Sequence, residues 1–373
     1  MLTPPPPVRT DESNAFGNDT MRRRAPGIVD EILKLNPDYH PAIQDALKKL
    51  RFELMNDAPI RLPEYPAPDH DDWLSASEPY RKDTWLNTGW FYAEHIFYRR
   101  VIEAVRWWET QRDPFGPKKA LEMNSESPWN LLEQALNADL ERRLHLALWG
   151  NRIDLSYEIA VGRGAHADAE DLLVDDTEKI LSHLRGTSGE VHLVADNYGT
   201  EFTMDAALID ELLKRHKVVL HVKLHPVFVS DVVVADVWDF LRRVAQKPAF
   251  TAFGQRLQTA FDDGRLRLAP DGFWNSPRFV WEMPLRLRKT FEKAALVIFK
   301  GDANHRRMIG DAIWPEGVAF ADALDYFPAP VATLRTLKSD PTVGFPVGSY
   351  ARLDSIDKNW RINGQRGVIQ SKL

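Results

Sequence analysis

The predicted fold follows first from the stretch Glu190-Val-His-Leu-Val-Ala-Asp-Asn-Tyr-Gly-Thr-Glu201. Its first half, residues 190–195, is a short apolar run of the kind that forms a buried strand. Its second half brings an acid, an amide and a glycine together. Residues 204–215 then have helical spacing, and residues 218–224 form a second apolar run. A strand, a helix and a strand at this spacing predict a mostly parallel sheet with helices on both faces.

The same alternation continues toward the C-terminus. The further predicted elements are a helix at 232–245, a short strand at 266–269, a strand at 294–299, a helix from about residue 305 and a last strand at 331–335. Strands that alternate with helices in this way define the fold class as α/β. In such sheets a ligand binds outside the carboxyl ends of the strands, so the residues after each strand are the first candidates for a site.

The N-terminal half has a different texture. Apolar residues recur at helical spacing in three stretches, at 41–52, 85–108 and 127–148, and no β alternation interrupts them. The large aromatic residues of the second stretch are expected to form core rather than a stacking platform. We therefore expect a helical N-terminal domain ahead of the sheet.

The expected division of the chain has three parts. Residues 1–25 are expected to be a disordered arm, because four prolines run from Pro4 to Pro7 and polar residues follow. The basic triplet Arg22–Arg24 favours a solvated lead-in to the first helix over a docking patch. Residues 26–185 form the helical domain with a connecting loop, and residues 186–373 form the α/β catalytic domain.

Composition narrows the class of protein. The 373 residues carry a net charge of −6, which does not favour nucleic-acid binding, although a local basic pocket remains compatible with it. There are no cysteines, so a metal site must use oxygen or imidazole ligands. We see no apolar run long enough to span a membrane and no secretory signal, and we expect a cytoplasmic protein without a membrane partner. The oligomeric state is left open.

Polar and charged residues follow four of the predicted strands. They are Asp196, Asn197 and Glu201 after the first strand, Asp231 after the second, Lys300, Asp302 and Asn304 after the third, and Arg335 and Lys338 after the fourth. Oxygen ligands of this kind suit Mg²⁺ or Mn²⁺, with Co²⁺ and Ni²⁺ as alternatives. Lysine and arginine suit the phosphate dianion of a small phosphorylated metabolite. Each group alone also fits a turn or a helix cap, and only their joint occurrence favours a site.

The histidines favour a site less. His221 and His225 are four residues apart, but they fall on a predicted strand and its end rather than on one helix face, so a zinc pair is the weaker interpretation. His305 follows the third strand and lies near the predicted site, but we do not place it among the catalytic residues.

Several segments together resemble the DUF89 family, also called the damage-control phosphatase or ARMT1-like family. They are Asp196-Asn-Tyr-Gly-Thr-Glu201, Phe228-Val-Ser-Asp231, Phe299-Lys-Gly-Asp-Ala-Asn304 with Gly310-Asp311, Arg335-Thr-Leu-Lys338, Trp90-Phe-Tyr-Ala-Glu-His-Ile-Phe-Tyr-Arg-Arg100 and Leu148-Trp-Gly-Asn-Arg-Ile-Asp-Leu-Ser156. The Arg-Thr-x-Lys motif at 335–338 resembles the mark of the family's third subfamily. Thr200 departs from the pattern, which usually has a bulky apolar residue there, and could alter substrate preference.

The resemblance implies a helical N-terminal part packed on a Rossmann-like, mostly parallel α/β sandwich domain. It implies one divalent metal held by Asp196, Asn197 and Asp231. It places substrate contacts on Glu201, on Lys300, Gly301, Asp302 and Asn304, and on Lys338, with Arg335 in the same motif. The activity it implies is hydrolysis of sugar phosphates such as fructose 1-phosphate or fructose 6-phosphate, supported by Mn²⁺, Co²⁺ or Ni²⁺.

The predicted mechanism uses the metal to polarise the phosphoryl group, and Lys338 and Lys300 to neutralise its oxygens. Asp196, Asn197, Asp302 and Lys338 are the expected catalytic residues. Either Asp302 or Glu201 could be the general base. A covalent aspartyl phosphate ranks second, because the sequence has no Asp-x-Asp-x-Thr motif of the haloacid-dehalogenase type.

Two other functions stay open. The resemblance also implies a protein-glutamate O-methyltransferase that uses S-adenosylmethionine, as proposed for animal members. Gly162-Arg-Gly-Ala-His-Ala167 matches Gly-x-Gly-x-x-Ala, but it enters an acidic stretch instead of a helix. The second alternative is a metabolite-binding protein without catalysis.

Overall fold

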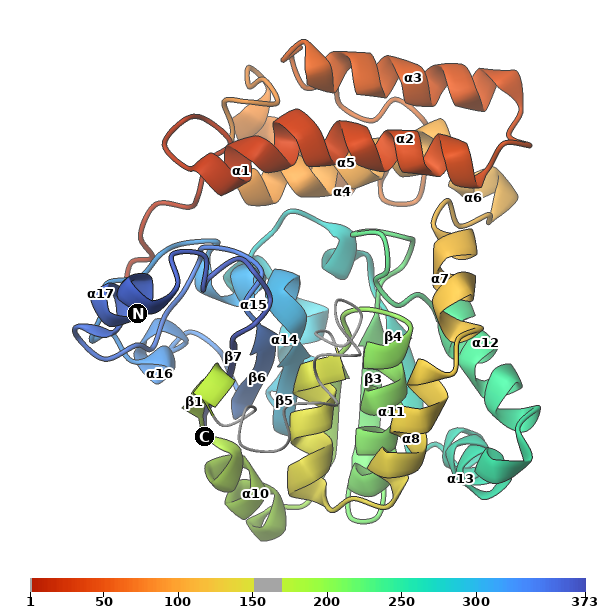
Figure 1. Cartoon of the computed structure of the whole chain (residues 1–373), viewed down its shortest axis with the longest axis vertical. Helices are drawn as coiled ribbons and strands as arrows, with labels where there is room; N and C mark the ends of the chain where they lie inside the picture. The colour runs from red at the N-terminus through yellow and green to blue at the C-terminus, as the bar shows by residue number, and fades with distance from the viewer. Residues whose placement is uncertain (1, 151–169) are drawn as a thin grey trace.

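The structure is a computed structural model that describes residues 2–150 and 170–373. Within these residues the chain builds one seven-stranded sheet in the order β1-β7-β6-β5-β2-β3-β4 (Figure 1). Its strands are β1 Leu172–Asp175, β2 Glu190–Val194, β3 Lys217–Val222, β4 Leu266–Pro270, β5 Ala294–Lys300, β6 Val331–Thr336 and β7 Gly367–Lys372. Strands β2 to β6 confirm the five predicted strands, and the predicted α/β class is confirmed with them.

The order of the strands creates a switch point beside β2. The chain adds β3 and then β4 on one side of β2, and it returns to add β5 and then β6 on the other side. These five strands pair in parallel. Because the order reverses between β2 and β5, their carboxyl ends open a crevice of the kind that binds ligands in α/β sheets.

Two strands were not predicted. β7 pairs antiparallel with β6, and β1 pairs parallel with β7. The strand predicted at 331–335 is therefore present, but the prediction that it is the last strand was wrong. β1 has only four residues, none of them fully buried, and it is a strand only because β7 offers it an edge.

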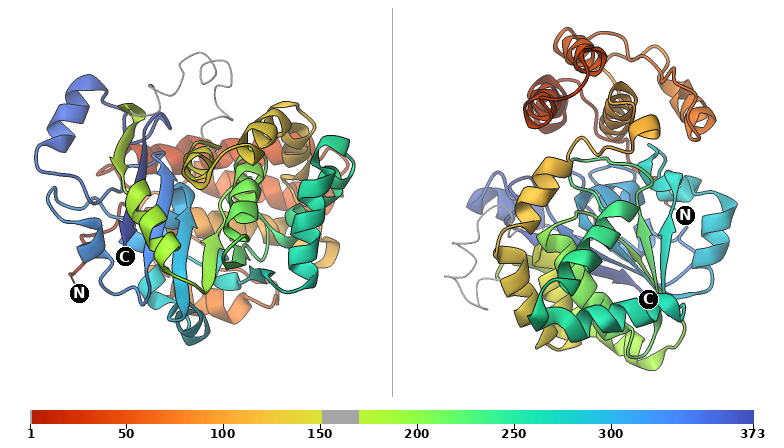
Figure 2. Two further views of the ribbon diagram at one scale, coloured as in Figure 1. Left: turned by 90° about the horizontal axis from the view of Figure 1, so that it is seen from below. Right: turned by 90° about the vertical axis from the view of Figure 1, so that its right-hand side faces the viewer.

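Helices cover both faces of the sheet because successive strand residues point to opposite faces (Figure 2). Leu296 and Ile298 of β5 pack into one apolar cluster, and Val297 and Phe299 pack into another. The elements from α7 onward are α7 Gly116–Met123, α8 Ser127–Leu136, a helix at 140–150, α10 Thr177–Gly186, α11 Thr200–Leu212, α12 Val234–Ala245, η3 Pro248–Phe250, α13 Thr251–Asp262, η4 Gly272–Asn275, η5 Val280–Glu282, α14 Leu285–Phe291, α15 Gly301–Ile309, α16 Phe320–Ala323 and α17 Ser349–Ile356.

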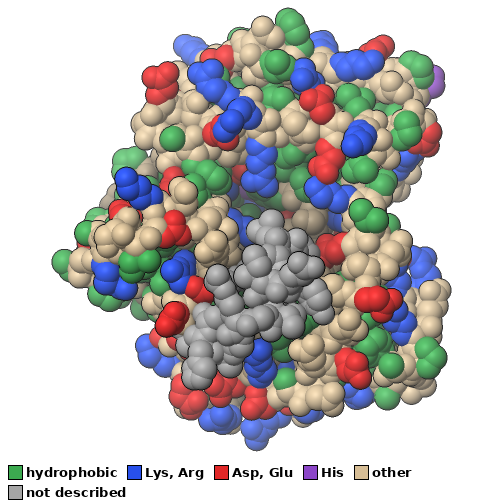
Figure 3. All heavy atoms as spheres, in the orientation of Figure 1, with side chains coloured by type: hydrophobic (Ala, Val, Ile, Leu, Met, Phe, Trp, Pro, Cys, Tyr) green, Lys and Arg blue, Asp and Glu red, His purple; other side chains and the backbone are tan. Residues whose placement is uncertain are grey.

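The first hundred or so residues form a separate layer of helices above one end of the sheet (Figures 1 and 2). Its elements are α1 Ala15–Asp19, η1 Thr20–Arg24, α2 Ala25–Leu35, α3 Pro41–Met55, α4 His70–Ser77, η2 Glu78–Tyr80, α5 Trp90–Ala104 and α6 Trp107–Thr110. Their apolar faces share one cluster, which includes Leu47, Trp85 and Phe97 and which the sheet hardly enters. We call this layer the helical part and the rest the α/β part, and the surface is hollowed between them (Figure 3).

The expected disordered arm at 1–25 differs from the structure. Residues 15–24 are helical, and the segment before them crosses between the two parts. The Val8 amide donates to the Asp311 carbonyl at 2.8 Å, and the Trp90 amide donates to the Val8 carbonyl at 2.9 Å. Backbone bonds of this kind hold a proline-rich segment that has no helix or strand of its own.

The expected boundary at residue 186 also falls inside the sheet domain. β1 and α10 precede it, and α8 packs on α11. We propose that the division lies near α7 instead, because Met123 and the α8 residues Trp129 and Leu132 belong to the cluster that covers the sheet. Among the described residues, no helix is long and apolar enough to cross a membrane.

Candidate active site

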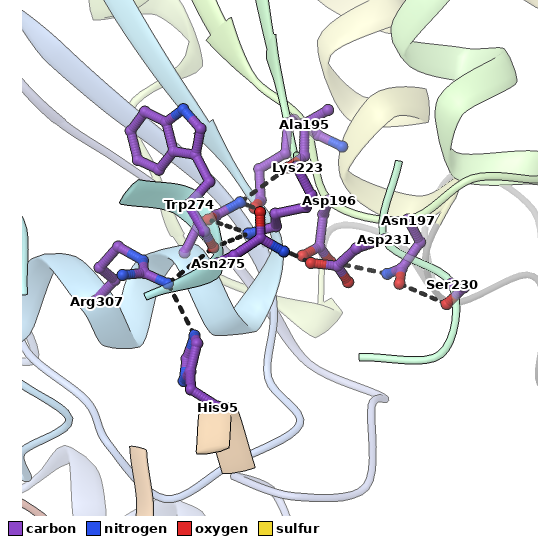
Figure 4. Close-up of polar contacts among 12 residues, drawn as sticks. His95, Ala195, Asp196, Asn197, Lys223, Ser230, Asp231, Trp274, Asn275 and Arg307 are labelled. Atoms are coloured by element: carbon purple, nitrogen blue, oxygen red, sulfur yellow. Dashed lines mark hydrogen bonds and ion pairs between the residues drawn. The ribbon is translucent and has the colours of Figure 1, made fainter. Parts of the chain in front are cut away.

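The carboxyl ends of β2 and β3 bring the first candidate ligands together. Asp196 and Asn197 follow β2, and Asp231 follows β3 after a loop. The two segments are joined by a β-bridge between Asn197 and Asp231 and by the Val232 amide, which donates to the Asp196 carbonyl at 2.8 Å. The side chains of Asp196, Asn197 and Asp231 point toward one another (Figure 4).

Asn197 is the best-held member of this group. Its Nδ2 donates to Asp196 Oδ2 at 2.8 Å and to Glu201 Oε2 at 2.9 Å. Its Oδ1 accepts from the Ser230 hydroxyl at 2.6 Å. Hydrogen bonds at both Nδ2 and Oδ1 therefore fix the orientation of the Asn197 side-chain amide. One lone pair of Oδ1 is left for another partner.

Gly301 allows Asp196 to occupy its position. Gly301 follows β5 and has a φ of +80°, and a Cβ at this residue would collide with the Asp196 carboxylate. Glycine is needed here both for the left-handed backbone and for the close approach of the two chains. The backbone of Gly301 thus lets strand β5 end directly beside Asp196, and the substrate contact expected at Gly301 stays a prediction.

The loop before Asp231 is strained. Phe228 and Val229 have φ values of +49° and +70°. A β-branched residue in the left-handed region is rare and costs on the order of 1–2 kcal/mol. Strain of this kind is stored where the surrounding structure fixes a functional loop. Both residues line the cavity described below.

The acid groups of the site repel one another. Burial, followed by the charges of Glu201 and Asp231, raises the pKa of Asp196 well above its ordinary value. Burial also raises the pKa of Asp231 to about 6, although Lys223 and Lys119 oppose this shift. Carboxylates that are buried together without enough positive charge have this signature, and a cation relieves it.

Lys223 and Lys119 are functional candidates that the sequence analysis missed. Lys223 Nζ lies 3.3 Å from Asp231 Oδ2, and Lys119 Nζ donates to the Asp231 carbonyl at 3.0 Å. Burial, opposed by the charge of Asp231, lowers the pKa of Lys223. Lys223 falls within a strand-like run, and Lys119 comes from α7, so no sequence pattern linked either to Asp231.

Lys300 and Glu201 lie behind the ligands and not in the cavity. The Lys300 ammonium is fully buried and contacts Glu201 Oε1 at 2.9 Å, Asp205 Oδ1 at 2.8 Å and the Ala147 carbonyl at 2.7 Å. Burial disfavours this ammonium, yet Asp205 and Glu201 raise its pKa above the ordinary value. The structure therefore places Lys300 as the partner of Glu201, which in turn holds Asn197.

Asp302 reaches the cavity, and Arg335 fixes it. Arg335 Nε donates to Asp302 Oδ1 at 2.8 Å, and its other nitrogens bond to the Pro341 carbonyl and to Ser339. Burial would raise the pKa of Asp302, but Arg335 and Arg306 hold it below its ordinary value. Arg335 therefore holds Asp302 in place, and of the two residues Asp302 is the one that lines the cavity.

Asn304 is also turned away from the cavity. Its Nδ2 donates to the carbonyls of Ala195 and Lys300 at 3.0 and 2.9 Å, so it ties the end of β2 to the end of β5. Lys338 lines the cavity, and its amide donates to Asp302 Oδ1 at 3.2 Å. The Arg-Thr-x-Lys motif therefore supplies one residue that holds Asp302 and one that lines the cavity.

A cavity of about 250 Å³ opens over these ligands, between the helical and the α/β part. Residues from both parts line it: Phe16, Arg24, Trp90, Glu94, Lys118, Asp196, Asn197, Phe228, Val229, Ser230, Asp231, Asp302, Ala303, Arg306 and Lys338. The sequence analysis missed the members from the helical part. The Trp-x-x-x-Glu spacing placed Trp90 and Glu94 on one helix face, and this signal could have identified them.

The residues present fit a divalent cation. Apart from its ion pair with Lys223, Asp231 Oδ2 is buried and has no hydrogen-bond partner in the described part of the chain. Two carboxylates and an amide oxygen are a donor set that suits Mg²⁺ or Mn²⁺. Among residues 2–150 and 170–373, no cluster of three or more histidines and acids is placed to hold a metal, so an amide must complete this set.

Other candidates lie elsewhere. His221 Nε2 is 2.9 Å from His192 Nδ1, whereas His225 contacts Asn275 and Asp69, so these residues do not form a zinc pair. His305 is buried against Phe320 and does not line the cavity.

Two segments from the sequence analysis need separate mention. The Thr200 hydroxyl donates to Glu122 Oε1 at 2.8 Å, away from the cavity lining. The Gly162–Ala167 match and residues 151–156 of the Leu-Trp-Gly-Asn segment lie outside the described residues.

Comparison with known proteins identifies the family of this chain. The model of the damage-control phosphatase ARMT1-like domain matches residues 20–353. The chain belongs to this family. A relative from Danio rerio, named damage-control phosphatase ARMT1, is 28% identical over 99% of this chain and 97% of the relative. One of the same name from Rattus norvegicus is 30% identical over 87% of this chain and 85% of the relative.

A solved structure agrees on the fold. The crystal structure of a DUF89 family protein from Pyrococcus horikoshii matches with a TM-score of 0.55 and 14% sequence identity. The match covers 96% of this chain and 98% of that chain. At this identity the similarity concerns the fold alone. The expected resemblance to the DUF89 and damage-control phosphatase family is confirmed.

Proposed function

We propose that this damage-control phosphatase family member is a metal-dependent phosphomonoester hydrolase of small metabolites. Sugar phosphates such as fructose 1-phosphate or fructose 6-phosphate are the proposed substrates. The observation that carries the proposal is the cavity, where Asp196, Asn197 and Asp231 meet Asp302 and Lys338. The relatives of this chain are named phosphatases, which supports the same reaction class.

The charges that line the cavity support a requirement for metal. Four basic side chains (Arg24, Lys118, Arg306 and Lys338) and four acidic ones (Glu94, Asp196, Asp231 and Asp302) line it. These charges balance, so the protein alone offers a phosphate dianion no net attraction beside two carboxylates. A divalent cation on Asp196, Asn197 and Asp231 adds the two positive charges that a phosphate dianion needs.

Each side chain then has a defined task. The metal, when bound, would supply Lewis-acid polarisation of a phosphoryl oxygen. Lys338 binds a phosphoryl oxygen. Asp302, held ionised by Arg335, accepts a proton from water while the water oxygen bonds to phosphorus. The bond from phosphorus to the sugar oxygen breaks, and the sugar oxygen leaves with the electron pair and takes a proton from solvent water. Glu201, also considered as the base, is buried against Lys300 and supports Asn197 instead.

The size of the cavity favours this proposal over methyl transfer. About 250 Å³ lies below the range of roughly 300–1,000 Å³ that is typical of sites for larger ligands. A hexose phosphate is closer to this size than S-adenosylmethionine together with a glutamyl peptide. The crowded carboxylates of the cavity also favour a metal-binding enzyme over a metabolite-binding protein that binds no metal.

The test is phosphate release from a panel of sugar phosphates. It is measured with EDTA and again after Mn²⁺, Co²⁺, Ni²⁺ or Mg²⁺ is restored. We expect release that EDTA stops and that at least one metal restores. Folded protein that releases no phosphate with any metal would overturn the proposal and direct the work to methyl transfer.

A further inference from the structure

Arg306 occupies a prepared position on the wall of the cavity. It lies on α15, and its side chain is only 3% exposed. Nε donates to Asp311 Oδ1 at 2.6 Å, and Nη1 donates to Glu94 Oε2 at 2.6 Å. Its Cζ lies 3.6 Å from the centre of the Trp90 ring. The guanidinium is therefore fixed on two edges by carboxylates and on one face by an indole.

One nitrogen of this guanidinium is left over. Nη2 is buried and has no hydrogen-bond partner in the part of the chain that the structure describes. A buried donor without a partner costs on the order of 1–3 kcal/mol, and the cost is larger for a charged group. Arg306, Glu94 and Trp90 all line the cavity, so a ligand there can supply the missing acceptor.

The neighbouring buried arginines, Arg307 and Arg335, offer the cavity no such donor, because neither of them lines it. Both terminal nitrogens of Arg307 are bonded, Nη1 to three carbonyls and Nη2 to His95 and the Trp274 carbonyl. All three nitrogens of Arg335 are bonded as well. Arg307 Nε also lacks a hydrogen-bond partner among the described residues, but it lies outside the cavity lining, whereas the unused donor of Arg306 belongs to a residue of that lining.

We propose that Arg306 is an anion-binding residue of this cavity, which donates from Nη2 to a tetrahedral oxyanion such as the phosphoryl group of the substrate. Glu94 and Asp311 are its positioning residues. The identity of the oxyanion rests on the proposed phosphatase function, but binding of inorganic phosphate does not. A planar guanidinium offers directed donors that the Lys338 ammonium cannot. Arg306 and Lys338 together would therefore both neutralise the oxyanion and fix its orientation.

The arrangement also makes the site depend on both parts of the molecule. Arg306 comes from the α/β part, but Glu94 and Trp90 belong to α5 of the helical part. The Phe91 amide donates to Asp311 Oδ2 at 3.1 Å, so α5 also fixes the second carboxylate. The oxyanion contact is complete only when α5 is seated on the α/β part.

The test compares two substitutions on the same helix. Arg306→Lys keeps the positive charge but loses the planar set of donor nitrogens. We expect the dissociation constant for inorganic phosphate, measured in the presence of Mg²⁺, to rise about tenfold or more. Binding of Mg²⁺ alone should not change. Arg307→Lys is the matched control, because it is equally buried but absent from the cavity lining, and its phosphate affinity should stay at the wild-type value. Wild-type phosphate affinity in Arg306→Lys would overturn the proposal.

A second measurement needs no variant. A crystal of the wild-type protein soaked with orthovanadate and Mg²⁺ should place a vanadate oxygen about 3 Å from Arg306 Nη2. Vanadate bound in the cavity with Arg306 out of hydrogen-bonding reach would overturn the proposal even if Arg306→Lys does not fold. If phosphate binding depends on Arg306 but no sugar phosphate is hydrolysed, this inference stands and the proposed function falls.

Discussion

Asp196 is held where its own charge is disfavoured. Burial, followed by the charges of the neighbouring Glu201 and Asp231, raises its pKa well above the ordinary value. The fold therefore keeps a carboxylate at this position at the expense of stability. Groups that raise the energy of the folded protein in this way are characteristic of functional sites.

This conflict predicts the effect of Asp196→Asn. The substitution keeps the shape of the side chain and removes one of the crowded negative charges. We expect the free energy of unfolding of the metal-free protein to rise by on the order of 1–2 kcal/mol, measured by urea unfolding in EDTA. Adding Mn²⁺ should stabilise the wild-type protein and leave the variant almost unchanged, because the variant lacks a ligand. Turnover should be lost.

Asp210→Asn is the control for this prediction. Asp210 is also buried, but it accepts two hydrogen bonds of 2.8 Å from Arg256. The same chemical change should lower stability here, because it breaks a satisfied ion pair. An Asp196→Asn variant that is destabilised as much as Asp210→Asn, and that still gains stability from Mn²⁺, would contradict the assignment of Asp196 as a ligand.

Sequence reasoning identified the side chains that meet at the strand ends more readily than the residues that hold them. Asp196, Asn197 and Asp231 follow strands, and the parallel sheet brings strand ends together whatever the details of packing. The direction of a side chain is set by tertiary contacts instead. Lys300 also follows a strand, yet its ammonium turns back to Glu201 and Asp205. The motif that contains it could not reveal that direction.

At the scale of elements, the junction between β5 and α15 positions the first ligand. Gly301 ends the strand, begins the helix and adopts a φ of +80°. Any side chain at this point would push the Asp196 carboxylate out of place. The geometry of the site thus depends on one residue that makes no chemical contact of its own.

Gly301→Ala should therefore damage stability and metal binding together. The left-handed backbone costs on the order of 1–2 kcal/mol for alanine, and the collision with Asp196 adds to it. We expect a lower free energy of unfolding in urea and at least about a tenfold weaker affinity for Mn²⁺ by titration calorimetry.

Gly27→Ala provides the matched control for that variant. Gly27 lies within α2, and a Cβ there meets nothing within 4 Å. Alanine should stabilise this helix by about 0.5–1 kcal/mol and leave Mn²⁺ binding unchanged. Gly301→Ala protein that binds Mn²⁺ as tightly as Gly27→Ala protein would show that the close approach of Gly301 to Asp196 is unimportant.

The predictability of each element follows from how much of its signal is local. The central strand β5 is an unbroken apolar run, so its pattern alone identifies it. β1 has no such pattern, and its pairing with β7 decides its structure. The helix α1 is set by its Asn14 cap, whose side chain accepts from the Gly17 amide, and by contacts of the preceding segment with both parts. Composition alone predicted disorder there.

At the scale of the whole molecule, the two parts share one cavity. The α/β part supplies the proposed metal ligands, Asp302 and Lys338, and the helical part supplies Phe16, Arg24, Trp90 and Glu94. A sheet of this type has an open crevice at its switch point, and here the helical layer covers it (Figure 2). The helical layer therefore forms one wall of the cavity and brings the exposed Arg24 into its lining.

Because the cavity is shared by the two parts, no sequence pattern identified Arg24 as one of its residues. It belongs to the basic triplet, which the sequence analysis treated as a solvated lead-in. Arg22 and Arg23 fit that description, because they are exposed and pair with Asn18 and Asp19 of the same helical segment. Arg24 is exposed too, but it lines the cavity. Only the docking of one part on the other separates the third arginine from the first two.

Arg24→Ala should therefore affect substrate binding without affecting the chemistry. Arg24 is exposed and far along the chain from the metal ligands, so we expect the KM for a sugar phosphate to rise about threefold to tenfold with kcat nearly constant. The effect should shrink as salt is added, because an exposed charge is screened. Arg22→Ala, two residues away and absent from the cavity lining, should leave KM unchanged. Equal effects of the two substitutions would mean that the helical part contributes only a general positive field, and no effect of either would mean that it does not contact the substrate through this helix.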